Sequence, residues 1–92
     1  MTYKILDSTR NITENKTRGD VYSYHVKGDA NDEVVFQGTN FDTWDHPVVI
    51  ASVKLHSSGS SSTVLQHSWS KIRGVIVAGT PEFIVTTNSE IE

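Results

Sequence analysis

The sequence predicts an all-β protein: a single antiparallel β-sandwich of six or seven short strands, with a polar N-terminal loop or arm. Apolar and β-branched residues recur in short segments, which turn residues separate at regular spacing. No stretch repeats its apolar residues with the 3.6-residue period of a helix. The 92 residues suffice for one domain with a modest core. We therefore expect a polar arm or edge segment at 1–20, the sandwich at 21–87 and a short acidic tail at 88–92.

The strands expected in the N-terminal half are separated by polar segments. Residues 3–6 form a short apolar piece, whereas 7–20 contain a single apolar residue, Ile12. The segment 21–27 alternates as a half-buried strand does, with one face formed by Tyr22, Tyr24 and Val26. A turn at 28–32 then leads into a further strand, which begins at Glu33.

The C-terminal half predicts a hairpin followed by two more strands. Within 48–56, one apolar face is formed by Val49, Ala51, Val53 and Leu55. The chain is expected to turn in the flexible loop 57–62 and to return along 63–69. That pairing would place on the same side Leu65, His67 and Trp69. The segment 72–78 loses its alternation, as a strand covered on both faces does, and 82–87 closes the sandwich.

The stretch 34–44, VVFQGTNFDTW, is an apolar strand that runs into a tight turn and an aromatic residue. Gly38 would let the strand end with a positive φ or a bulge, and Asn40 and Asp42 would bond to the backbone of the residues that follow them. Trp44 would bring this loop down onto the sheet. Packing in the core is the favoured role for Trp44, and an exposed binding platform is the alternative.

This order of motifs resembles the small β-sandwich modules of tailed-phage virion proteins, which have a jelly-roll or discoidin-like fold. The resemblance covers residues 33–87. It depends on an apolar strand ending in a Gln-Gly-Ser-Asn type of turn, an acidic turn leading to Trp, and a late strand of the type aromatic-x-x-apolar-Arg-apolar. The matching positions are Gln37, Gly38, Thr39, Asn40, Asp42, Thr43, Trp44, Trp69, Ile72 and Arg73. The chain departs from the pattern in having Thr39 for the usual serine, in lacking the glycine expected after Asp42, and in having Phe41 inserted before Asp42.

The resemblance implies a structural or attachment component of a virion, such as a capsid decoration protein or a tail or fibre element. Its partners would be other virion proteins, and a homo-oligomer is expected, with a trimer favoured by analogy with capsid and fibre symmetry. The alternative is a carbohydrate-binding module, because sandwich folds host both roles. The candidate contact residues for either role are Tyr22, Tyr24, Trp44, Trp69 and Arg73.

Arg73 follows Ile72 in a strand with little other charge. We expect its guanidinium either to reach the solvent rim or to pair with a carboxylate, for which the candidates are Asp42, Asp45 and Glu82. A structural ion pair is the simpler interpretation. A contact with another protein is the alternative, because arginine is enriched in interface cores.

Composition and spacing argue against several other classes of function. The net charge is -3 and the basic residues are scattered, which argues against nucleic-acid binding. No apolar run approaches the roughly 20 residues that span a bilayer. The first ten residues lack the pattern of a secretion signal, so we expect synthesis in the cytoplasm. Residence in the virion is what the resemblance implies.

Catalysis, metal binding and a cofactor are not expected. The chain contains no cysteine, and Ser58-Gly59-Ser60 lacks the strand-to-helix elbow that exposes a nucleophile. His56 and His67 flank the serine-rich loop but fall on opposite faces in the expected register, and His25 and His46 lie far away in sequence. No pair of histidines has the spacing that places two imidazoles on one ion.

Overall fold

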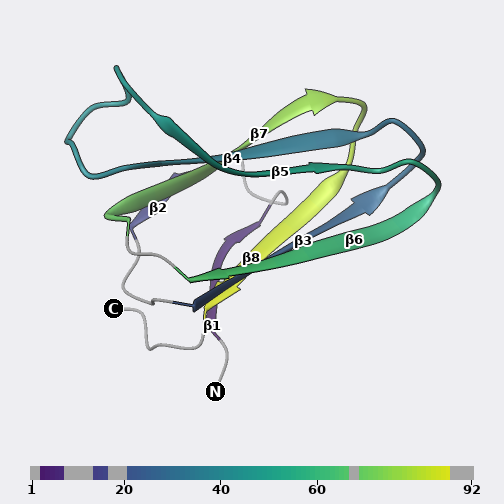
Figure 1. Cartoon of the computed structure of the whole chain (residues 1–92), viewed down its shortest axis with the longest axis horizontal. Coiled ribbons are helices and arrows are strands. Elements are labelled where there is room, and N and C mark those ends of the chain that lie inside the picture. Colours follow the sequence, from purple (N-terminus) through teal and green to yellow (C-terminus); the bar gives the residue numbers. More distant parts are fainter. Residues whose placement is uncertain (1–2, 8–13, 17–20, 67–68, 88–92) are drawn as a thin grey trace.

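The structure is a computed structural model that describes residues 3–7, 14–16, 21–66 and 69–87. Two antiparallel sheets of four strands each form two layers around a common core, with no helix among these residues (Figure 1). The first sheet contains, in spatial order, β1 (Tyr3–Asp7), β8 (Glu82–Thr87), β3 (Val21–Gly28) and β6 (Gly59–Gln66). The second sheet contains β2 (Glu14–Lys16), β7 (Lys71–Ala78), β4 (Glu33–Thr39) and β5 (Val48–Lys54).

The pairing scheme is that of a long hairpin rolled up into two layers. Each strand of the first half of the chain pairs with one of the second half: β4 with β5, β3 with β6, β2 with β7 and β1 with β8. This is the strand order of a jelly roll, so the expected all-β sandwich is confirmed. Within the segment 1–20, the described residues form β1 and β2 at the sheet edges. The remainder of the expected arm and the tail 88–92 lie outside the described residues.

The core is built from the inward faces of both sheets. On β3 the alternation predicted from the sequence is confirmed, since Tyr22, Tyr24 and Val26 are fully buried. Aromatic rings connect the two layers: Tyr24 lies 4.8 Å from Phe36 between ring centroids, and Phe36 meets Phe83 edge to face at 5.5 Å. Such tilted and edge-to-face arrangements add to the area that aromatic residues bury. The whole cluster comprises Leu6, Tyr22, Tyr24, Val26, Val34, Phe36, Val53, Leu55, Ile72, Phe83 and Val85.

The prediction of a hairpin around the serine-rich loop 57–62 is wrong. β5 and β6 belong to different sheets, and the chain crosses from one layer to the other between them (Figure 1). Leu55 directs this crossing, because its N–H donates to the carbonyl of Asp32 and its carbonyl accepts from the N–H of Asn31. Val53 of β5 is nevertheless buried and Leu65 of β6 packs against the core, as a hairpin would also have placed them. The alternation of apolar residues therefore does not distinguish a hairpin within one sheet from a connection between two sheets.

Two further expectations fail on the second sheet. A bulge leaves Ile50 as an extra residue in β5, since Phe36 pairs with Ala51 and Gln37 with Val49. Val49 is thereby turned away from the expected apolar face and is 59% exposed. The second half of β7 is not covered on both faces either, because three consecutive apolar residues are exposed there: Val75, Ile76 and Val77.

Candidate functional site

The outer face of the second sheet carries a group of valines. Directly opposed residues of antiparallel strands point the same way, so the row Ser52, Val35 and Val75 lies on the side opposite to the buried Phe36. Val49 lies in the next outward row, beside Gln37 and Arg73. We call Val35, Val49 and Val75 the valine patch; Val35 is half-buried and the other two are exposed.

Trp44 and Arg73 lie at one end of the valine patch. The guanidinium carbon of Arg73 is 4.3 Å from the centroid of the Trp44 ring, and Lys71 Nζ is 5.4 Å from it. Arg73 Nε also donates a 2.7 Å hydrogen bond to Gln37 Oε1 on the neighbouring strand. The arginine is thus fixed between an aromatic ring and an amide, which is a typical cation–π arrangement. Trp44 is half-buried on this outer face, so the favoured expectation that it packs in the core is wrong.

Two of the three carboxylates that were candidates to pair with Arg73, those of Glu82 and Asp45, have other partners. Glu82 forms an ion pair with Lys27 on the first sheet, at 3.3 Å. Asp45 Oδ2 accepts a hydrogen bond from Thr43 Oγ1, and the backbone carbonyl of Asp42 accepts one from Lys71 Nζ. Among the side chains that the structure describes, none of these three carboxylates pairs with Arg73.

The loop 40–47, between β4 and β5, is held against the start of β7. Asn40 Oδ1 accepts a 2.8 Å hydrogen bond from the N–H of Ser70, and Lys71 Nζ reaches the carbonyl of Asp42 at 2.9 Å. The expectation that Asn40 and Asp42 bond to the residues that follow them is therefore wrong. Asn40 bonds across 30 positions of the chain, and no local pattern predicts such a contact. The result is a fixed loop that carries Trp44 onto the sheet.

Gly38 is required for a close approach. Its φ is not among the positive values, which occur at Asn31, Gly59 and Gly79, and the bulge lies between Phe36 and Gln37. A Cβ built on Gly38 would lie only 2.8 Å from the ring of Trp69. Trp69 is half-buried and packs against the core from this side. Trp69 is therefore a packing residue, and the expected positive φ at Gly38 is corrected to a close contact between backbone and ring.

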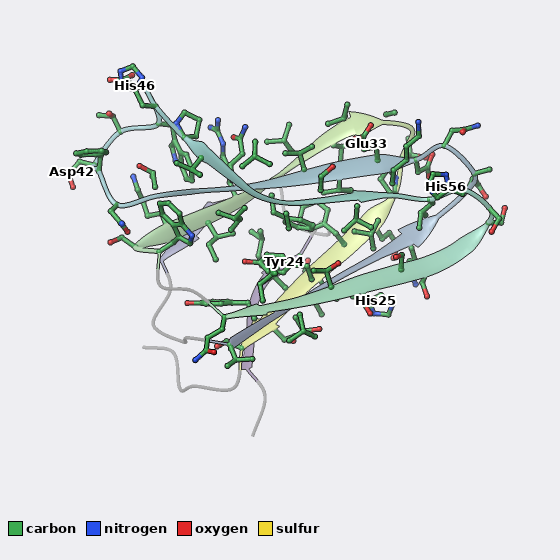
Figure 2. The ribbon with its side chains drawn as sticks, viewed as in Figure 1. Tyr24, His25, Glu33, Asp42, His46 and His56 are labelled. Atoms are coloured by element: carbon green, nitrogen blue, oxygen red, sulfur yellow. The ribbon has the colours of Figure 1, made fainter. Side chains whose placement is uncertain are left out.

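The structure separates the five candidate contact residues into two groups. Tyr22 and Tyr24 have no exposed surface, so they cannot contact a partner or a glycan, and this expectation is wrong. Burial raises the pKa of Tyr24, which favours its neutral form. Figure 2 shows Tyr24 between the two layers. Trp44 and Arg73 lie together on the outer face. The alternation on β3 had already placed both tyrosines on one face, but it did not indicate which face is inside.

The described histidines are dispersed. Figure 2 shows His25 on the outer side of the first sheet, His46 in the loop before β5 and His56 near the opposite end of the molecule. His67 lies outside the described residues. In the part of the chain that the structure describes, no three His, Asp or Glu side chains gather in a way that could hold a metal ion. The same residues include no helix long and apolar enough to cross a bilayer.

Comparison with known protein families, curated proteins and solved structures finds no match. The family that the motif residues suggest therefore stays a prediction.

Proposed function

We propose that the protein is a non-enzymatic structural component of a tailed-phage virion, such as a capsid decoration, tail or fibre protein, and that it binds a neighbouring virion protein through the valine patch. The observation that carries this proposal is the exposure of apolar side chains on a sheet face: 59% for Val49 and 37% for Val75. Apolar side chains grouped on an outer face favour a contact with another protein. Burying them there would be the main source of binding free energy.

Trp44 and Arg73 support the same contact. Tryptophan and arginine are the residue types that most often dominate the binding energy of protein interfaces. Because Gln37 and the Trp44 ring already hold the guanidinium, less side-chain entropy is lost when a partner covers it. Many copies on one particle would bind together with greater strength than each contact has alone.

Carbohydrate binding is the second candidate, and the half-buried Trp44 on an open face is the observation that favours it. Sugar rings stack on such aromatic faces. However, the other aromatic candidates are engaged in the fold: Tyr22 and Tyr24 are fully buried and Trp69 packs against the core. The jelly-roll order does not decide between the two roles, because capsid proteins and lectins both use it.

The decisive experiment has two stages. Mass spectrometry of purified phage particles from the source lysate should detect the chain, and its absence from the particles would contradict the proposal. Particles stripped of the chain should then bind the purified protein again. Val49→Glu should weaken this binding at least tenfold, because it places a charge in the apolar contact.

His25→Glu is the matched control, since His25 is exposed on the outer face of the other sheet and its substitution should leave binding unchanged. A shift of tryptophan emission on adding oligosaccharides, lost in Trp44→Ala, would instead favour the glycan hypothesis. Circular dichroism should show that all three variants remain folded.

A further inference from the structure

The four edge strands differ in how well they are protected against pairing with another chain. A free strand edge offers unpaired N–H and C=O groups, and natural proteins interrupt such edges with bulges, charges, proline or short length. β1 has a bulge between Lys4 and Leu6, and β2 is only three residues long and contains Glu14 and Lys16. β5 has the bulge at Ile50, follows Pro47 and ends in Lys54.

β6 has none of these protections. Its eight residues, GSSSTVLQ, include no charge and no proline. All eight pair with β3 in one uninterrupted register, from Gly59 opposite Gly28 to Gln66 opposite Val21. Among the strands that the structure describes, none pairs with the other side of β6, which forms the end of the first sheet (Figure 1).

We infer that β6 pairs antiparallel with β6 of a second copy of this chain, which joins the two first sheets into one continuous eight-stranded sheet. A second copy fits best because hydrogen bonding along a strand requires another free and regular edge. Each of the other described edges carries a bulge or is very short, so only β6 offers such an edge. The absence of charge on β6 also means that two identical strands do not repel each other.

The alternation of β6 limits the possible registers. Ser62 and Val64 face outward, since they pair with His25 and Ser23, whereas Thr63 and Leu65 face the core side. If Thr63 lies opposite the partner's Thr63, then Val64 lies opposite the partner's Ser62. In this register every side chain keeps its face, and only uncharged residues oppose one another. The two-fold axis passes through the Thr63 pair.

This dimer replaces the trimer that analogy with capsid symmetry suggests. It uses the first sheet only, so the valine patch on the second sheet stays accessible in both copies. One dimer would therefore present two patches to a particle. Pairing of a single strand covers less area than the roughly 800 Å² per partner of a standard interface. We therefore expect a reversible dimer whose population rises with protein concentration.

Light scattering over a concentration series tests the inference on the full chain. The apparent mass should rise from the 10.2 kDa of the monomer toward twice that value. Ser62→Lys combined with Val64→Lys should keep the protein monomeric throughout the series, because each lysine would face a lysine of the partner. Both side chains are exposed, so the variant should fold normally, and circular dichroism checks this.

The matched control reverses one of the two charges. In Ser62→Lys combined with Val64→Glu, each lysine would face a glutamate of the partner, so dimerisation should be retained or strengthened. A wild-type protein that stays monomeric, a trimer, or equal behaviour of the two double variants would overturn the inference. Val49→Glu should still dimerise. Failure of the particle-binding proposal can thus be told apart from failure of the dimer.

Discussion

The two outer faces of this sandwich differ sharply although both sheets contribute to one core. The outward positions of the first sheet are mostly polar, and the exposed Lys27 and Glu82 form an ion pair there. The outward positions of the second sheet include the valine patch and the stacked Trp44 and Arg73. A sheet with one solvated face normally alternates apolar and polar residues. The first sheet follows that rule more closely, with Val64 as an exposed apolar exception.

The difference comes from apolar residues on the outer face of the second sheet. Val34 and Val35 are successive residues of β4 that point to opposite faces, and both are apolar. The other outward residues of β4, Glu33 and Gln37, are polar, so the strand otherwise alternates as one with a solvated face does, and Val35 is the apolar exception. No further strand of the described structure covers this outer side, where the loop 40–47 places Trp44 beside Arg73 (Figure 1). A partner that covers the valine patch would bury the exposed side chains of Val49 and Val75.

The largest expected effect on stability comes from removing a core side chain, and the inner faces of the two sheets should lose similar amounts. Phe36→Ala should lower the free energy of unfolding by about 3–5 kcal/mol, because it removes a fully buried ring that contacts Tyr24 and Phe83. Urea denaturation followed by circular dichroism measures this. Phe83→Ala, on the facing sheet, is the matched comparison and should cost a similar amount. A loss below about 1 kcal/mol for either variant would contradict the common core.

A smaller loss of stability is expected for a substitution at Gly38. Gly38→Ala places a Cβ against the Trp69 ring and should cost about 1–3 kcal/mol, because a close-packed interior accommodates an added methyl poorly. Trp69→Leu in the same chain should recover part of this loss by removing the clashing ring. A double-mutant cycle that shows additive effects would indicate that the two residues do not touch.

Burial of Tyr24 predicts a loss of stability at high pH. The pKa of Tyr24 is raised in the folded state, so the folded protein holds this proton more tightly than the unfolded chain does. Its contribution is therefore complete below the unfolded value of about 10 and decreases as the pH rises above it. Urea denaturation from pH 8 to 11 should show this decrease. Tyr24→Phe should have a smaller slope above pH 10, and an unchanged slope would contradict the assignment.

The sequence predicts much of the fold and less of the site, for physical reasons. Alternation on β3 and β4 identifies strands and inward residues because it reflects local geometry. It does not reveal that β5 and β6 lie in different sheets, since that depends on hydrogen bonds between Leu55 and the distant turn at Asn31 and Asp32. The sequence does not predict the pairing of Arg73 with Trp44 for the same reason, because it too depends on contacts between distant residues. Arg73 meets Trp44 where the loop 40–47 is held by long-range hydrogen bonds, Asn40 with Ser70 and Lys71 with Asp42.

The smallest effects should separate the two outer faces most directly. Lys27→Ala removes an exposed ion pair and should change stability by less than about 0.5 kcal/mol. Arg73→Ala should cost more, about 1–2 kcal/mol, since the guanidinium loses both its hydrogen bond to Gln37 and its contact with Trp44. Denaturation curves of the two variants, measured side by side, give this difference.

Arg73→Lys should recover only part of the loss, because an ammonium keeps the charge but cannot stack as a planar group. Trp44 emission should change in both Arg73 variants and remain as in the wild type in Lys27→Ala. Equal costs for the two alanine variants would mean that Arg73 is an ordinary surface cation, and that the stacked pair contributes nothing to the order of the second sheet's outer face.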